Sequence, residues 1–184
     1  QSAYRFPSNQ QQWINLAVGG TRLVGSNANF VNYLGTNTNP LYTFNTVPNT
    51  SNINNFKIIT MPTVKPESVS SFELGYKGLL MENKLLLDVY GYFGQYQNFI
   101  SRVNTIQTTS GVAADTSNPA KRTNISIVIN APDKVKTYGF GASVDYRLPL
   151  NFTIGANVSS DILKDVPANF IAFFNAPQYR FNIG

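Results

Sequence analysis

The stretch from Val135 to Ser159 contains two runs in which apolar and polar residues alternate strictly. In the first run one parity holds only apolar or aromatic side chains, and the other holds only Thr, Gly, Ser and Asp. After Arg147–Pro149 the alternation resumes and continues to Ser159. A period of two is the period of a β-strand, so the stretch predicts an antiparallel β-hairpin closed by a short turn.

The content of the two faces constrains the fold further. Asp145 is the only charged residue on the polar face between Thr137 and Tyr146, and the apolar face has a tyrosine near each end, at Tyr138 and Tyr146. A soluble sheet carries Lys and Glu on its wet face, whereas a strand of a membrane barrel has small polar groups toward the lumen and aromatic residues at both interfaces. Each run also has about the 9–11 residues that a tilted strand needs to cross a bilayer. The hairpin therefore favours a transmembrane barrel.

A soluble β-sandwich remains the alternative, and the orientation of the apolar face separates the two. In a barrel, Tyr138, Phe140 and Phe152 face outward, away from any protein core. In a sandwich, Val144 and Ile154 lie in a dry interior between two stacked sheets.

Composition excludes several classes of function. Charged residues make up 12% of the chain and aromatic residues 13%, and no window holds the roughly 18 apolar residues that a membrane helix needs. The chain has no Cys and no His, and its nine Asp and Glu are scattered, so we expect no enzyme, no metal site and no cofactor. The net charge of +5 is spread thinly, with Lys121–Arg122 as the only basic pair, so we expect no nucleic-acid partner.

The first third of the chain shows little alternation. Residues 1–61 are rich in Asn, Thr, Ser, Gln and Gly with scattered aromatic residues, and they predict a long loop region that carries short helices, for instance around Gln10–Leu16. We expect residues 1–63 to form an external loop region and residues 64–184 to supply about five barrel strands. Because the chain begins at Gln1 without an initiator Met and stops at Gly184 within another alternating run, we expect a fragment of a longer protein.

Alternating runs return after residue 68. Two strands are predicted on either side of a short turn at Met81–Asn83, which sets Lys77 opposite Asp88 on the lumen side. Long loops are expected at Arg102–Asn124 and Ser160–Pro177, and the β-branched run Ile125–Ile129 should lead into the central hairpin. Short turns therefore alternate with long loops, as they do on the periplasmic and external sides of outer-membrane barrels.

Several segments resemble a known family. Val64–Gly78 is similar to the "LKPE…S…ElGyKg" stretch that begins a late barrel strand of TonB-dependent outer-membrane receptors, and an aromatic strand follows it at Leu85–Phe93 as in that family. Shorter likenesses are Tyr4–Ser8 to "fRaPs", Leu23–Asn27 to "l.GNp", Lys136–Gly139 to "akt.GvE" and Phe174–Pro177 to "fN.Pk". The chain departs from the family at Gly141, where the pattern has Glu, and in the longer gap between Asn27 and Lys65, which suggests an enlarged external loop.

The resemblance, which is to receptors of the Bacteroidota type, implies a location in the bacterial outer membrane, in contact with its lipid. It implies an intact barrel of about 22 antiparallel strands around a plugged lumen, of which this chain is a C-terminal part without the plug domain. It further implies import of a scarce nutrient (a small molecule, a glycan or a peptide) with energy from the TonB–ExbB–ExbD complex. It does not decide whether a surface lipoprotein covers the barrel as a lid. The alternative function is that of a secreted β-sandwich adhesin that binds carbohydrate.

Candidate site residues follow from these expectations. Capture of substrate would fall to loop residues with aromatic or cationic side chains: Trp13, Phe30, Tyr33, Tyr42, Phe44 and Arg102. The simpler interpretation, that each aromatic side chain only packs against its own loop, stays open. Polar groups of the lumen wall would be Glu73, Lys77 and Asp88, and Lys65–Glu67 would fix the start of a strand through the rigid Pro66.

Overall fold

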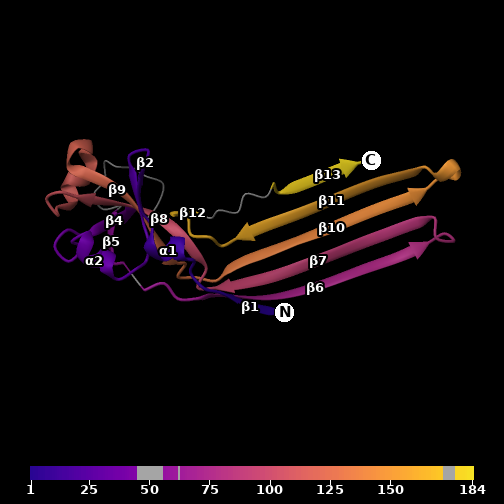
Figure 1. The fold of residues 1–184 in the computed structure, drawn as a ribbon, viewed down its shortest axis with the longest axis horizontal. Helices are drawn as coiled ribbons and strands as arrows, with labels where there is room; N and C mark the ends of the chain where they lie inside the picture. The colour runs from indigo at the N-terminus through magenta and orange to yellow at the C-terminus, as the bar shows by residue number, and fades with distance from the viewer. Residues whose placement is uncertain (45–55, 62, 172–176) are drawn as a thin grey trace.

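The computed structural model is an elongated molecule made of two β-sheets that follow one another along its long axis (Figure 1). It describes residues 1–44, 56–61, 63–171 and 177–184. Long strands run side by side to short turns at one end, while a second sheet and the short helices gather at the other (Figure 1). The predicted all-β fold class is confirmed, and among the described residues every strand pair except β3 with β9 is antiparallel. None of the helices in the described ranges is long and apolar enough to cross a membrane.

The first sheet, here called the wall sheet, has six antiparallel strands in the order β1-β6-β7-β10-β11-β13. Its strands are β1 (Ser2–Arg5), β6 (Glu67–Leu80), β7 (Leu85–Gln97), β10 (Val135–Arg147), β11 (Thr153–Lys164) and β13 (Tyr179–Ile183). The central hairpin predicted from the alternation is confirmed as β10 and β11, and the short turn predicted at residues 81–83 joins β6 to β7. Leu150, expected at the start of the second run, lies instead in the turn with a φ of 64°.

The register gathers the apolar side chains on one side of the wall sheet. Residues directly opposite each other in an antiparallel pair share a face, and Phe72 lies opposite Phe93, which lies opposite Tyr138, which lies opposite Ile162. Every second residue along each strand continues this face, so that it forms rows across the sheet. We call it the apolar face, and its largest exposed side chains include Phe72, Leu74, Tyr76, Phe93, Phe140, Ile154, Tyr179, Phe181 and Ile183.

The height of the apolar face matches a bilayer. The row that begins at Phe72 and the row that begins at Leu80 are separated by 80 − 72 = 8 residue steps along β6. At about 3.4 Å per residue this is about 27 Å along the strand. A tilt of about 40° reduces it to about 21 Å, close to the roughly 25 Å apolar band of outer-membrane barrels.

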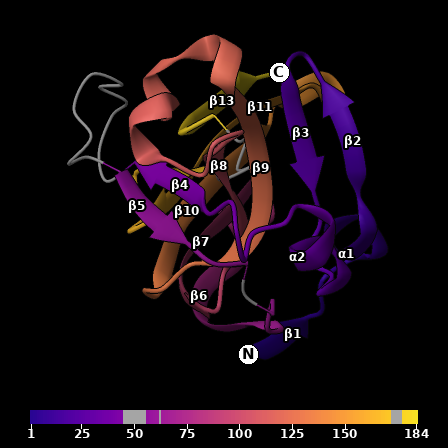
Figure 2. The same cartoon turned by 90° about the vertical axis from the view of Figure 1, so that its left-hand side faces the viewer.

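The second sheet, here called the outer sheet, extends the wall beyond the apolar face. Its strand order is β2-β3-β9-β8-β4-β5, and β12 pairs with β8 beside this path. The strands are β2 (Asn15–Val18), β3 (Thr21–Val24), β4 (Leu41–Phe44), β5 (Phe56–Ile59), β8 (Ile100–Thr108), β9 (Arg122–Asn130) and β12 (Phe170–Ile171). Because β8 follows β7 and β9 leads into β10, one long hairpin belongs to both sheets (Figures 1 and 2).

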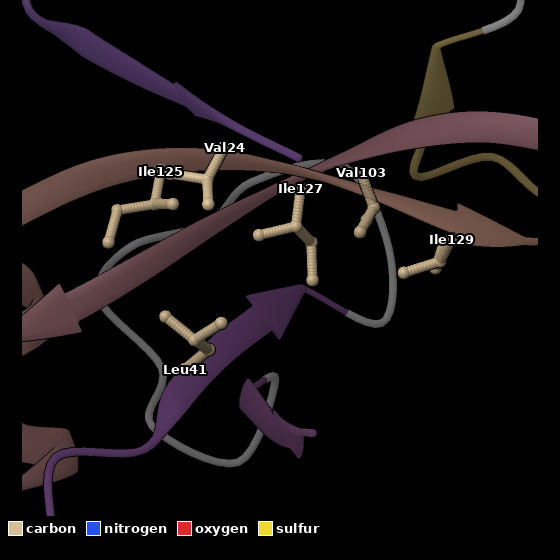
Figure 3. Close-up of a cluster of buried hydrophobic side chains, with 6 residues drawn as sticks. All are labelled: Val24, Leu41, Val103, Ile125, Ile127 and Ile129. Atoms are coloured by element: carbon tan, nitrogen blue, oxygen red, sulfur yellow. The ribbon is translucent and has the colours of Figure 1, made fainter. Parts of the chain in front are cut away.

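The hydrophobic core lies under the outer sheet. Six apolar side chains from β3, β4, β8 and β9 are almost fully buried against one another: Val24, Leu41, Val103, Ile125, Ile127 and Ile129 (Figure 3). Phe30 and Leu34 from the region of helix α2 (Asn29–Tyr33) pack against this cluster. The outer sheet is therefore held by ordinary burial of apolar side chains, whereas no residue of the wall sheet belongs to this buried cluster.

Several expected loops are strands instead. The polar segment Arg102–Asn124 contains most of β8 and the start of β9, and the loop expected from Ser160 begins only after Lys164. β8 was not predicted because several of its polar side chains are covered and bonded to backbone: Thr105 Oγ1 donates to the Ile125 carbonyl at 2.8 Å, and the Gln107 amide donates to the Leu34 and Asn39 carbonyls. Because protein backbone rather than water bonds these polar side chains, the strand does not need to alternate between polar and apolar residues.

The first 61 residues differ in a similar way from the expected loop region. The described part of this segment holds strands β1 to β5, although each is only four residues long, too short to show a period. The short helix expected after Pro7–Ser8 is confirmed as α1 (Asn9–Trp13), which begins with a capping box between Ser8 and Gln11.

A polar joint connects the two sheets at the start of β6. The buried carboxylate of Glu67 accepts hydrogen bonds from Arg5 at 2.9 and 3.1 Å and from the Ile100 N–H at 2.8 Å. Close by, the Asn130 side chain accepts from the Lys65 N–H at 2.7 Å and donates to the Lys65 carbonyl at 3.0 Å, as a paired strand would. β6 begins at Glu67, so the predicted start of a strand at Lys65–Glu67 is confirmed, while the part played by the rigid Pro66 stays a prediction.

Candidate functional site

The outer sheet presents one group of the predicted capture residues. Helix α2 carries Phe30 and Tyr33, whose rings meet edge to face at 6.2 Å between centroids. Phe30 turns toward the core, whereas the Tyr33 side chain is exposed. The guanidinium of Arg22 from β3 lies 4.8 Å from the centre of the Tyr33 ring and donates to Asn15 Oδ1 at 2.8 Å. Tyr33, Arg22 and Asn15 thus form a surface cluster with an aromatic face and polar groups around it.

Trp13 lies at the end of α1 with an exposed side chain. The backbone of α1 is bound to the segment before α2, because the Gly25 N–H donates to the Ile14 carbonyl at 2.8 Å and the Ser26 N–H to the Gln11 carbonyl at 3.0 Å. Gly25 is required here, since a Cβ would stand 2.3 Å from a backbone oxygen of α1. The two helices are thereby held as neighbours, and Trp13 and Tyr33 both reach solvent from them.

The other predicted capture residues are placed differently. Tyr42 in β4 is buried, and its hydroxyl donates to the Gly111 carbonyl at 2.7 Å, so it ties the outer sheet to the β8–β9 tip. Arg102 in β8 is half-buried and donates to the Ser126 carbonyl at 3.2 Å. Burial lowers the pKa of the Arg102 guanidinium from its ordinary value. Phe44 ends β4, and its side chain lies outside the described part of the structure.

The predicted polar groups lie together on the face of the wall sheet opposite the apolar face. Lys77 and Asp88 stand directly opposite in the register, and Lys77 Nζ lies 2.9 Å from Asp88 Oδ2, which confirms the predicted pairing. Glu73 lies four residues before Lys77 in β6 on the same face, opposite Tyr92 of β7. Their role as groups of a lumen wall stays a prediction.

Two tyrosines on this polar face were missed by the sequence analysis. Tyr92 donates to Asp161 Oδ1 at 2.5 Å, and Asp161 also forms an ion pair with Arg180 of β13. Gly139 and Gly141 in β10 make room for the rings, because a Cβ at Gly141 would stand 2.4 Å from the Tyr90 ring and a Cβ at Gly139 would stand 2.8 Å from the Tyr92 ring. In the register each glycine lies directly opposite one of the tyrosines, Gly139 opposite Tyr92 and Gly141 opposite Tyr90. This match could be recognised in the sequence only if the pairing of β7 with β10 were already known.

The polar face therefore carries two groups of polar side chains. One is the ion pair of Lys77 in β6 with Asp88 in β7, and the other, four residues further along β7, is Tyr92 with Asp161 of β11 and Arg180 of β13. Tyr90 lies between the two groups on β7. Side chains of this kind can form hydrogen bonds with polar solutes and with neighbouring polar surfaces. Among the described residues, no group of three or more His, Cys, Asp or Glu side chains is placed to hold a metal ion.

Comparison with known families gives one result over the full length. The family model "TonB dependent receptor-like, beta-barrel" matches residues 2–184. Comparisons with curated proteins and with solved structures find no match. The family match and the Val64–Gly78 motif thus point to the same group of proteins.

Proposed function

The chain belongs to the family of TonB-dependent receptor β-barrels, and on that premise we propose that it is part of a transporter that captures a scarce nutrient at its external surface and imports it through a plugged barrel with energy from TonB. The family is one of outer-membrane transporters, so the protein resides in the bacterial outer membrane. TonB and a transported small substrate are the partners that this family implies.

One observation carries the proposal: the wall sheet exposes a continuous apolar face. Phe140 and Phe152 are 45% and 65% exposed, and Val144 and Ile154, which a sandwich would bury, are 37% and 54% exposed. Within the described residues no second sheet covers this face. Contact with acyl chains stabilises a face of this kind and contact with water does not, so the exposed face supports a membrane barrel over a secreted sandwich adhesin.

We assign the outer sheet to the external side, because it lies beyond the apolar face at the end opposite the short turns. In this arrangement Trp13, Tyr33 and Arg22 form the capture surface, with Phe30 supporting Tyr33 from the core. The polar face of Glu73, Lys77, Asp88, Tyr92, Asp161 and Arg180 lines the lumen, where it meets the plug and the passing substrate.

Finer features of the proposal come from the sequence motifs. The likeness of Val64–Gly78 to the start of a late barrel strand supports a receptor of the Bacteroidota type in which this chain supplies a C-terminal part of the barrel. The plug domain and the segment that contacts the TonB–ExbB–ExbD complex would lie in another part of the protein. The substrate is a small molecule, a glycan or a peptide, with a surface lipoprotein as a lid if it is one of the latter two.

The test of transport compares three strains: the wild type, a strain lacking the receptor gene and a strain lacking TonB. The compounds consumed from a defined nutrient mixture are measured by mass spectrometry of the medium. We expect one compound to remain in the medium of both deletion strains and to be consumed again when the receptor gene is restored. Consumption of every compound without the receptor, or independently of TonB, would contradict the proposal.

The test of the capture surface uses the compound so identified as the probe. The substitution pair Trp13→Ala and Tyr33→Ala in the full-length receptor should weaken binding by tenfold or more, since each exposed ring contributes roughly 1 kcal/mol or more to a stacked contact. Tyr4→Ala is the matched control, because Tyr4 is an exposed aromatic residue of β1 in the wall sheet. Equal binding by the pair and the control would exclude this surface.

A further inference from the structure

The apolar face ends sharply at its external edge. The last apolar row across the sheet consists of Phe72, Phe93, Tyr138 and Ile162. The next row outward, two residues further along each strand, consists of Ser70, Gln95, Lys136 and Lys164. A change from apolar to polar within one row marks the level at which acyl chains give way to lipid headgroups.

Two lysines stand directly opposite each other in this polar row. Lys136 of β10 is the register partner of Lys164 of β11, and both belong to the lipid-facing side because Tyr138 and Ile162 follow them on the same face. Like charges directly opposite in a sheet are destabilising, so a counter-charge close to this pair would stabilise it.

The counter-charge within the described chain is incomplete. Asp165 Oδ2 lies 2.8 Å from Lys136 Nζ, and the side chains of both residues are about half exposed. Lys164 Nζ lies 5.4 Å from the centre of the Tyr138 ring, which leaves the ammonium exposed above the aromatic row. Two cations with one carboxylate thus leave one net positive charge at the headgroup level.

A hollow in the apolar face lies directly below the lysines. It has a volume of about 520 Å³ and opens where Gly91 and Ser160 leave space between larger neighbours, among them Phe72, Phe93, Phe140 and Tyr179. A cation pair above an apolar hollow fits a phosphate joined to an acyl chain.

We propose, on the basis of the external side assigned under the proposed function, that Lys136 and Lys164 bind the phosphate of an anionic outer-leaflet lipid whose acyl chain fills the hollow at Gly91. The occupant is a lipid rather than a soluble anion because the site continues the bilayer-facing surface, with charge at the headgroup level and apolar side chains beneath it. The receptor thereby holds a specific lipid at its rim, in addition to the bulk lipid around the barrel.

The experiment uses the full-length receptor in a neutral detergent. Diphosphoryl lipid A and the same lipid without its phosphates are titrated separately, and bound lipid is counted by native mass spectrometry. We expect the wild type to bind the phosphorylated lipid about tenfold more tightly, and the double variant Lys136→Gln with Lys164→Gln to lose this preference. Lys57→Gln is the matched control, since Lys57 is an exposed lysine of β5 in the outer sheet, and it should bind as the wild type does.

Two further variants separate this proposal from a general loss of structure. Asp165→Asn removes the competing carboxylate, and because Asn tolerates the φ of 63° at this position, binding of the phosphorylated lipid should become tighter. Gly91→Leu should fill the hollow and weaken binding with both lysines intact, since a Cβ at Gly91 meets only a carbonyl oxygen at 3.8 Å.

Equal binding of both lipids by the wild type would overturn the proposal, and so would wild-type binding by the double variant. Binding of inorganic phosphate that matches that of the lipid would overturn it as well, because it would indicate a soluble anion. If the double variant fails to fold, Asp165→Asn decides alone: tighter binding supports the proposal and unchanged or weaker binding contradicts it.

Discussion

The joint between the two sheets provides a prediction with a magnitude. Glu67 is 5% exposed and accepts from Arg5 and from the N–H of Ile100, which is itself 4% exposed. In Glu67→Ala the Ile100 N–H loses its acceptor while still buried, which costs about 1–3 kcal/mol. The ion pair adds less than about 1 kcal/mol, because the Arg5 side chain is half exposed. The local opening of the joint should therefore become about 2–3 kcal/mol easier.

Hydrogen–deuterium exchange of the full-length receptor measures this opening directly. Peptides that cover residues 100–108 should exchange about 30- to 150-fold faster in Glu67→Ala, since each 1.4 kcal/mol corresponds to a factor of ten. Glu67→Gln keeps an oxygen that can accept from Ile100, so it should lose less than about 1 kcal/mol. Glu73→Ala, at an exposed carboxylate on the same strand, is the control and should leave these peptides unchanged. The reasoning is refuted if Glu67→Ala and Glu73→Ala exchange alike.

Two further predictions concern the wall sheet and the external tip. Gly139→Ala should prevent correct assembly, because its Cβ would stand 2.1 Å from a backbone carbonyl of β11. In Gly141→Ala the new Cβ meets the Tyr90 ring, so the protein should assemble with a lowered midpoint of heat-induced unfolding, and Tyr90→Ala should restore that midpoint. Electrophoretic mobility with and without heating measures both effects. At the tip between β8 and β9, hydrogen bonds from Ser110 and Lys121 hold the pKa of Asp115 below its ordinary value. The stabilisation that these bonds give is therefore present above about pH 4 and is lost as the pH falls through the lowered pKa. Hydrogen–deuterium exchange at residues 109–121, corrected for intrinsic rates, should rise between pH 6 and pH 3 in the wild type but not in Asp115→Asn.

The sequence predicted the wall sheet well because each of its strands faces two different environments. Where one side of a strand meets lipid and the other meets polar surroundings, apolar and polar side chains must alternate along the strand. β10 and β11 show this alternation at almost every residue. The pairing of Lys77 with Asp88 followed from the same period and a short turn.

The sequence did not reveal the outer sheet because its strands are stabilised in a different way from those of the wall sheet. Most of β8 is covered on both sides, by the hydrophobic core and by backbone that bonds polar side chains such as Thr105, so its sequence does not alternate between polar and apolar residues. The docked strands such as β2 and β3 are four residues long and draw their stability from the β8–β9 hairpin, which is far away in the sequence. For the same reason the sequence could not show that Tyr42 is buried or that Arg22 lies over Tyr33.

The lipid-facing position of the apolar face is the central claim, and site-directed spin labelling tests it most directly. The 184 residues contain no cysteine, so one Cys at a time can be placed at positions 138–146 of the full-length receptor in liposomes and labelled with a nitroxide. Even-numbered positions should be accessible to oxygen, which dissolves in the bilayer, and odd-numbered positions to a water-soluble nickel chelate. Absence of this period of two, or access of the nickel chelate to the even-numbered positions, would contradict the account.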